Sequence, residues 1–423
     1  MQKRILFIGL LLLAIGLLMS ACAAPETPEC PDCPEVDCPE VDCPEAEPCP
    51  EAPACPDCPE PEACPEAEAV LPGIEAAWSS SGHADSEAEA FRHWDEDDPA
   101  VVSTRCSKCH STQGNIEFNT TGETTTEFPA EEVMGIECVA CHDKAAAMKD
   151  SVVMPSGIEL AGLGSEARCM ECHQGRNSVV SLNTSIATAA GIEIDAAAED
   201  PIAAAAEAAA QADPDTVYEE LGFSNIHYYA AAATKYGTLA KGGGEYAGKT
   251  YDGNFAHVEG YDTCVGCHSP HTLEVQVESC AHCHGEGEPQ DYRMEGSAVD
   301  FDGDGNIEEG VSYEIEGLKE VLFAELAANG LVYDAHAYPY FFDEAGERFA
   351  AWTPRLARAA YNYQVSMKDP GGFAHGGKYI IQLLYVSIED LNADLVEGLR
   401  RIDHGHFAGS EEAFRHWDED DPA

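Results

Sequence analysis

Positive charge is scarce in this sequence of 423 residues. Lysine and arginine together number 22, against 78 aspartates and glutamates, and the formal net charge is −56. Phosphate binding needs a basic footprint, so this composition argues against a nucleic-acid partner. We interpret the acidic excess mainly as solubility or adaptation to a saline habitat, with steering of cationic partners as the alternative.

Cysteine is absent from most of the chain, although it numbers 19. Ten cysteines fall in five copies of Cys-x-x-Cys-His, and Cys22 stands near the N-terminus. The remaining eight lie in one tract rich in Pro and Glu, at Cys30, Cys33, Cys38, Cys43, Cys49, Cys55, Cys58 and Cys64. No His follows a Cys-x-x-Cys pair in that tract.

The five Cys-x-x-Cys-His copies have the spacing at which c-type haem is attached. In such motifs the two thiols bond to the haem vinyl groups, and the adjacent His reaches the iron. A zinc knuckle or a redox Cys-x-x-Cys is the alternative, but neither needs His after the second Cys in every copy. The copies are Cys106, Cys109 and His110; Cys138, Cys141 and His142; Cys169, Cys172 and His173; Cys264, Cys267 and His268; and Cys280, Cys283 and His284.

The N-terminus reads as an export signal. Lys3 and Arg4 precede an apolar stretch, Ile5–Leu18, that is too short for a stable membrane span. We assign residues 1–21 to a lipoprotein-type signal peptide and predict lipidation of Cys22, with an ordinary signal peptide as the alternative. Either reading exports the chain, and a lipid would anchor it to the cell membrane or outer membrane, facing the periplasm or the exterior.

Residues 22–75 are predicted to form a disordered stalk. Frequent Pro and Glu with few large apolar residues cannot build a core. An extended chain of fifty residues at roughly 3.1 Å each spans on the order of 150 Å. The eight stalk thiols are expected to pair in an oxidising compartment, with metal binding as the alternative.

The rest of the chain predicts a mainly α fold with little regular secondary structure, organised around stacked haems. Residues 76–292 form a five-haem module with an Ala-rich surface insertion at 186–212. A calcium-like acidic loop follows at 293–312, and a small helical region covers 313–404. The helices are expected at 313–333, Pro354–Lys368 and Tyr379–Leu399, and Pro354 suits a helix start.

The last residues repeat an earlier segment. Residues 89–100 recur unchanged as 412–423, and Cys106 follows the first copy whereas the second copy ends the sequence. We interpret 405–423 as a partial repeat of 82–100 in a truncated chain, which would make five haems a minimum. The alternative is a segment that completes a haem site in another copy of the protein.

Histidine is plentiful enough to supply a second ligand to every iron, because eleven of the 16 lie outside the motif positions. A haem that only transfers electrons gains from a second strong ligand. The favoured distal candidates are His83, His93, His227, His257 and His271. We rank His336, His375 and His404 below these, and expect His282 to be solvated.

An acidic loop resembles the start of an EF-hand. Oxygen ligands at alternate positions followed by Gly305 suit a hard cation, and we predict a structural Ca²⁺ site. Val311 stands where the closing Glu is usual, so Glu309 is expected to close a shortened loop. The predicted ligands are Asp300, Asp302, Asp304, Asn306 and Glu309.

Together these features resemble the bacterial multihaem c-type cytochromes of respiratory and extracellular electron transfer, which are related more distantly to octahaem reductases. The resemblance covers roughly residues 82–292 and includes the run Cys267-His-Ser-Pro-His271 and the segment Asn225–Tyr228. It implies an electron carrier with bis-His haems, redox partner proteins and an external acceptor such as a metal, rather than a substrate-converting enzyme.

Two other functions remain open. The first is an oxidoreductase of a small nitrogen or sulfur oxyanion, which needs one open haem. The second is a self-associating filament subunit, in which the repeated segment ligates haem between copies.

Overall fold

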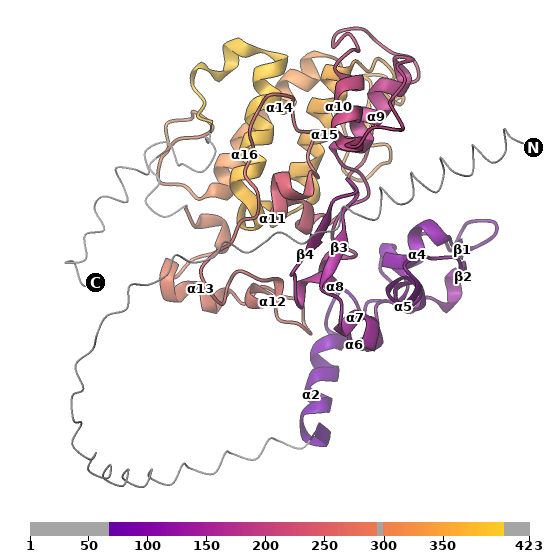
Figure 1. Cartoon of the computed structure of the whole chain (residues 1–423). Helices are drawn as coiled ribbons and strands as arrows, with labels where there is room; N and C mark the ends of the chain where they lie inside the picture. The colour runs from indigo at the N-terminus through magenta and orange to yellow at the C-terminus, as the bar shows by residue number, and fades with distance from the viewer. Residues whose placement is uncertain (1–66, 294–298, 402–423) are drawn as a thin grey trace, which may run out of the picture. The chain divides into compact units, whose positions relative to one another are not determined.

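The computed structural model describes residues 67–293 and 299–401 (Figure 1). The predicted signal peptide, Cys22, the eight stalk cysteines, His404 and the partial repeat at 405–423 lie outside the described residues. The first described helix, α2 (Ala67–Ser79), begins within the range assigned to the stalk. The end of that range is therefore helical, which corrects the predicted stalk boundary; its Ala, Glu and Leu residues favour a helix.

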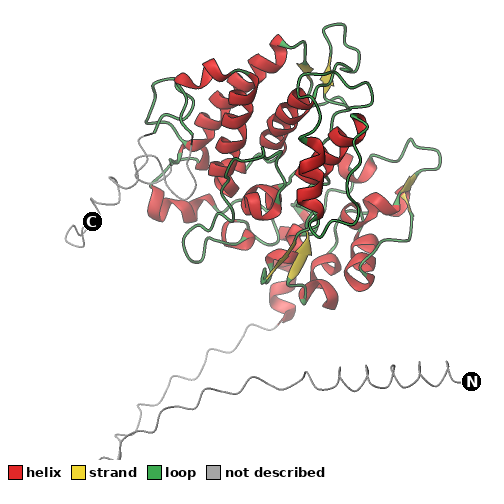
Figure 2. Ribbon diagram, turned by 45° about the horizontal axis from the view of Figure 1, so that its top comes forward, coloured by secondary structure: helices red, strands yellow, loops and turns green. Residues whose placement is uncertain are grey.

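The described residues form helices separated by long loops, with little strand, which is compatible with the mainly α prediction (Figure 2). The helices of the haem-motif region are α2, α3 (Glu89–Arg92), α4 (Thr104–His110), α5 (Thr112–Thr121), α6 (Cys138–His142), α7 (Lys144–Ala147), α8 (Glu166–Met170), α12 (Cys264–Cys267) and α13 (Val277–His284). The others are α9 (Val179–Ala189), α10 (Pro201–Ala209), α11 (Ala231–Ala240), α14 (Val311–Ala328), α15 (Pro354–Lys368) and α16 (Gly372–Leu391).

Extended structure in the described residues consists of short antiparallel pairs. Strand β1 (Val101–Val102) pairs with β2 (Phe128–Pro129), β3 (Ser151–Val153) with β4 (Glu159–Ala161), and β5 (Val332–Tyr333) with β6 (Phe341–Phe342). Single turns of 3₁₀ helix occur at Ala130–Glu132, Pro289–Asp291 and Ala393–Glu397.

The largest apolar core lies in the C-terminal helical region. Helix α16 packs against α11, α14 and α15, and its Tyr379 and Leu383 are buried. Helix α15 matches its predicted range: the Thr353 side chain accepts a hydrogen bond from the Leu356 backbone, and Pro354 occupies the first turn. Helix α16 begins earlier than predicted, at Gly372, and ends at Leu391 because the next residue, Asn392, is extended.

The Ala-rich segment is part of this core, not only a surface insertion. Helices α9 and α10 pack against each other, and Ile186, Ala209 and Ala212 belong to the same buried cluster as Trp352 of the C-terminal region. The Asp200 side chain caps α10 by accepting hydrogen bonds from two backbone amides. The prediction of a surface insertion at 186–212 was wrong for the buried faces of these helices.

The haem-motif region has only small apolar clusters. One contains Phe91, Trp94 and Val102 near the first motif, and another contains Met154, Met170 and Tyr236 near the third. Helices α12 and α13 contribute no buried residue. A region so poor in protein core leaves room for apolar groups that the polypeptide itself does not supply.

No helix among the described residues has the length and apolar character that crossing a membrane requires.

Candidate functional site

Each Cys-x-x-Cys-His motif lies on or beside a single turn of helix. Helix α6 consists of the second motif alone, and α12 covers the two cysteines of the fourth with His268 as its C-cap. Residues three and four apart share one helical face, so this turn directs two thiols and one imidazole to the same side. All ten motif cysteines are free thiols, as thioether attachment requires.

Every motif histidine faces one histidine from outside the motifs. The five pairs have ring centroids 5.9–6.3 Å apart. Two imidazoles on opposite sides of one metal, each at a metal–nitrogen distance of about 2.0–2.1 Å, place their centroids roughly 6 Å apart. The pairs are His110 with His227 (5.9 Å), His142 with His271 (6.3 Å), His173 with His83 (6.1 Å), His268 with His375 (6.3 Å) and His284 with His257 (6.0 Å).

Four of the five predicted distal histidines occupy these positions: His83, His227, His257 and His271. The structure does not bring His93 opposite a motif histidine at this spacing. Its exposed ring contacts Trp94 edge-on at 5.2 Å, and its Nδ1 lies 2.9 Å from Oε1 of Glu89. The fourth motif instead faces His375 of α16, which sequence reasoning ranked low. The exposed His282 hydrogen-bonds within its own turn to the Ser279 carbonyl.

Backbone carbonyls orient three of the motif imidazoles. Nδ1 lies 2.8 Å from the Ala90 oxygen in His110 and 3.1 Å from the Tyr229 oxygen in His173. The same contact in His268 is 2.9 Å long and reaches the Leu273 oxygen. When Nδ1 carries the proton and donates it to the carbonyl, Nε2 keeps its lone pair for a metal.

Burial favours the neutral form of five of these ten imidazoles. Burial, reinforced by His173, lowers the pKa of His83 to about 4. Burial together with His110 lowers the pKa of His227 to about 4 as well. Burial also lowers the pKa of His110, His173 and His257. Neutral imidazole is the form that ligates a metal, so these residues fit a buried iron.

His375 has a different partner, the buried carboxylate of Asp369. Its Nδ1 lies 2.9 Å from both carboxylate oxygens. Burial acts to lower the pKa of His375, but the Asp369 carboxylate outweighs this and the net shift is upward. Sequence reasoning missed this pair because it lies in the C-terminal helical region, far along the chain from any motif.

The motifs contact one another through their cysteines. The Cys109 thiol of the first motif donates to the Glu171 carbonyl of the third at 4.0 Å. The Cys264 thiol of the fourth donates at 3.3 Å to Oε1 of Glu166, three residues before Cys169. The guanidinium of Arg168 donates to the Cys141 carbonyl of the second motif at 3.2 Å. The third motif therefore adjoins the first, second and fourth.

Buried ion pairs support this junction. Glu171, inside the third motif, is 2 % exposed and accepts from Lys108 Nζ at 2.8 Å and from Lys149 Nζ at 2.9 Å. Glu166 lies 2.7 Å from Lys235 Nζ and accepts from the Cys264 backbone amide at 3.1 Å. These contacts fix the positions of the first, third and fourth motifs relative to one another.

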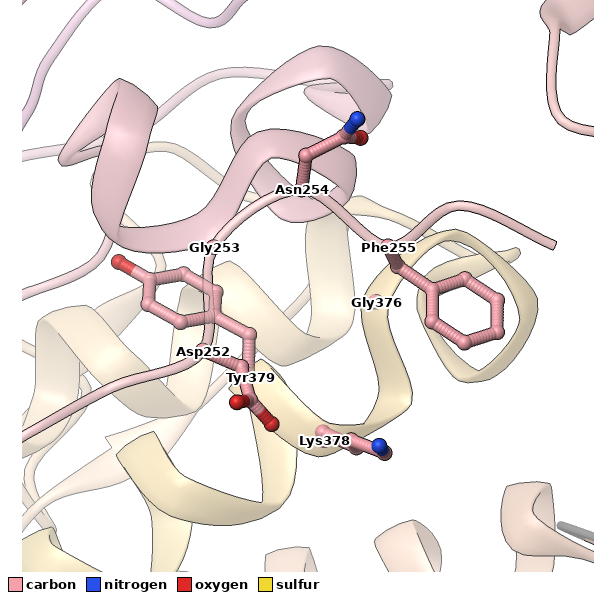
Figure 3. A pocket seen from close by; sticks show the side chains of 7 residues that line it. All are labelled: Asp252, Gly253, Asn254, Phe255, Gly376, Lys378 and Tyr379. Atoms are coloured by element: carbon pink, nitrogen blue, oxygen red, sulfur yellow. The ribbon is translucent and has the colours of Figure 1, made fainter. Parts of the chain in front are cut away.

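A small pocket lies between a loop and helix α16 (Figure 3). It is lined by Asp252, Gly253, Asn254 and Phe255 of one loop and by Gly376, Lys378 and Tyr379 of α16. Gly376 follows His375, and the Phe255 ring lies 6.1 Å from that of His257. The pocket thus belongs to the surroundings of the fourth and fifth motifs.

The acidic loop brings carboxylates together, including one that sequence reasoning missed. Asp300, Asp302 and Asp304 form one group, and Asp302 with Glu309 and Glu314 forms another, each within 4.8 Å. Burial, followed by neighbouring carboxylates, raises the pKa of Asp302 to about 6. Asn306 turns its amide to Glu309 at 3.1 Å. Glu314 lies in the first turns of α14. The only signal in the sequence that could have identified it is an acidic residue on the buried face of a predicted helix.

Two comparisons with known proteins find similar sequences. Residues 89–184, which contain the first three motifs, match the family model described as cytochrome c7 and related cytochrome c. The chain is 25% identical over 333 residues to the C-type polyheme cytochrome OmcB of Geobacter sulfurreducens, in strains DL-1/KN400 and PCA. The match covers 67% of this chain and 37% of those relatives, so the chain spans little more than a third of their length. No solved structure matches.

The attachment motifs, the opposed histidine rings and these two similarities point to one family and confirm the predicted resemblance. The chain is therefore similar to the multihaem c-type cytochromes.

Proposed function

We propose that this cytochrome carries electrons along five covalently bound haems, each ligated by two histidines, between a membrane or periplasmic donor and an external acceptor. The observation that supports it is the set of five ring pairs at 5.9–6.3 Å. Haem c, when bound, supplies one-electron redox chemistry. The two histidines of each pair would both hold the iron, which suits electron transfer rather than substrate binding.

The polypeptide has three tasks in this proposal. The two cysteines of each motif would attach one haem, and the paired histidines would hold it in one orientation. The carbonyls of Ala90, Tyr229 and Leu273 hold three of the imidazoles in one tautomer. The contacts among the first four motifs keep neighbouring haems close enough for electrons to pass between them.

The same pairs favour a carrier over an enzyme. A haem that converts a nitrogen or sulfur oxyanion needs an open coordination position, yet each of the five motif histidines in the described residues faces a second histidine. A filament would require ligation between copies, and within this chain each motif already has an internal partner. The repeated segment that suggested a filament lies outside the described residues.

We also infer export and lipid anchoring from the signal-like N-terminus and Cys22, and redox proteins as partners. Export and anchoring rest on residues 1–22, which lie outside the described part of the chain. Replacing Cys22 by Ser and following membrane partition of the haem-loaded protein tests the anchor. Release of the variant into the soluble fraction is expected.

Calcium binding at the acidic loop is the further part of this proposal. Asp302, Glu309 and Glu314 bring three carboxylates within 4.8 Å, and their mutual repulsion favours a divalent cation. In this arrangement Glu314 supplies the closing carboxylate that position 311 lacks. The role is structural, because the loop connects the haem-motif region to α14.

Mass spectrometry and low-temperature EPR of the haem-loaded protein test the main proposal. A mass increase of five haems and five low-spin ferric signals are expected. A high-spin signal that changes on addition of nitrite, hydroxylamine or tetrathionate would instead establish an open haem and an enzyme. Fewer than five haems would exclude one of the motifs as an attachment site.

A further inference from the structure

The fourth motif is the one whose second histidine is held by a buried charge. Asp369 follows the last residue of α15, and His375 lies in the first turn of α16. Asp369 is 3 % exposed, and both its carboxylate oxygens lie 2.9 Å from Nδ1 of His375. The ring of His375 in turn lies 6.3 Å from that of His268.

Among the paired histidines, the other Nδ1 contacts are to neutral groups. His110, His173 and His268 reach backbone carbonyls. A hydrogen bond to an ionised acceptor is roughly twice as strong as one to a neutral acceptor. It also draws the Nδ1 proton away from the ring and so makes Nε2 a more basic ligand.

No Lys or Arg of the described residues forms an ion pair with Asp369. Among the described ion pairs, the partner of Asp369 is His375 itself. Lys235 also faces His375, but its Nζ lies 2.7 Å from Oε1 of Glu166. Asp369 accepts one further hydrogen bond, from the Gly371 backbone at 3.3 Å. A buried negative charge next to an axial ligand favours the ferric over the ferrous iron.

Two glycines fit the backbone closely around this pair. A Cβ on Gly371 would lie 2.6 Å from Cε1 of His375, and one on Gly376 would lie 2.3 Å from the Thr234 carbonyl oxygen. Helix α16 leaves helical geometry at Gly376. The imidazole is therefore held between Asp369, Gly371 and a kinked helix.

From these contacts we propose that Asp369 is a positioning residue that lowers the reduction potential of the fourth haem through His375. The inference rests on the proposed bis-His function. The Cys264 backbone amide of the fourth motif donates to Glu166, three residues before the third motif. The Cys267 carbonyl accepts at 2.8 Å from the amide of Gln276, which precedes the helix of the fifth motif. An electron passing from third to fifth haem would therefore cross a centre that is seldom reduced, which limits the rate of passage in both directions.

Replacing Asp369 by Asn in the full haem-loaded protein tests the proposal, since Asn keeps an oxygen acceptor and removes the charge. In an optical redox titration followed by EPR, one of five components should become at least tenfold easier to reduce, equivalent to 59 mV for one electron. All five irons should stay low-spin. Asp262→Asn is the matched control: it removes the same charge two residues before Cys264 without touching an axial ring, and should shift no component by more than threefold.

His375→Met assigns the affected component, because a Met ligand raises the potential of the same iron. In that background D369N should produce less than a threefold further change, since the imidazole through which Asp369 acts is gone. Asp369→Glu retains the charge, so the ease of reduction of the fourth haem should stay within threefold of that in the unmodified protein. This variant replaces D369N if D369N does not accumulate. A tenfold shift in D369E would then count against the proposal.

The two ideas fail differently. A low-spin D369N protein with unchanged potentials would overturn the role of Asp369 and leave the bis-His assignment standing. A high-spin fourth haem in the unmodified protein would overturn the ligation on which the inference rests. So would an H375M variant whose spectrum is the same as that of the unmodified protein.

Discussion

The imidazole rings of His110 and His227 are inclined at 74° to each other, whereas the rings of the other four pairs are inclined at 15–38°. Nearly perpendicular axial imidazoles leave two iron d orbitals close in energy, and nearly parallel ones separate them. The first haem should therefore differ magnetically from the other four.

We expect one of the five low-spin EPR signals to be markedly more anisotropic than the rest. His227→Met should remove that signal and leave the other four unchanged. His271→Met, which alters a pair inclined at only 15°, is the matched control and should remove one of the less anisotropic signals. Five EPR signals of similar anisotropy would contradict the nearly perpendicular rings of His110 and His227.

Opening the second iron should be possible with a single substitution. In His271→Ala, His142 loses its opposed ring, so one haem is expected to become high-spin and to bind added cyanide or imidazole. The rest of the titration should be preserved. His93→Ala is the control, because His93 is exposed and faces no motif histidine; a high-spin signal in that variant would mean that His93 is a ligand.

The carboxylate of Glu171 should matter more for stability than a surface ion pair. Glu171→Gln leaves the ammonium groups of Lys108 and Lys149 without their partner in a largely buried site. The expected loss in free energy of unfolding is about 3 kcal/mol, the lower end for a broken buried pair. Glu389→Gln, which breaks the half-exposed contact with Lys249, should cost less than about 1 kcal/mol. Denaturant unfolding of the haem-loaded variants measures both, and equal losses would exclude a special role for Glu171.

Calcium should stabilise the protein through the acidic loop. A free calcium concentration one hundred times the Kd adds about 2.7 kcal/mol to stability. Chelation should therefore lower the thermal midpoint, and Glu314→Gln should abolish the response to calcium. Glu308→Gln, an exposed acid outside the clustered groups, should keep it. A response that survives in E314Q would place the cation elsewhere.

Local spacing and long-range packing account for what could and could not be predicted. The attachment turns follow from a five-residue pattern, and α15 follows from Thr353 and Pro354 at its start. His83, His257 and His271 could be proposed because they lie near motifs in the chain. His375 could not, because only the packing of α16 against α11 and the kink at Gly376 bring it to the fourth motif.

Two other differences have the same origin. Glu314 reaches the acidic loop from a neighbouring helix, where it accepts from the backbone of Phe301 and Asp302 and pairs with Arg293. The alanines of α10 are too small to show which face is buried until α9 is packed against them. Neither contact leaves a local signature in the chain.

The opposed histidines also imply an order of assembly. A chain that emerges from its N-terminus presents His83 before any motif, so the third iron could gain both ligands as soon as His173 appears. The first would wait for His227, the second for His271 and the fifth for His284. The fourth would be last, because His375 emerges after all five motifs. Maturation would thus begin at the third motif, which adjoins three of the others. It would end at the fourth motif, whose second histidine lies in the C-terminal helices.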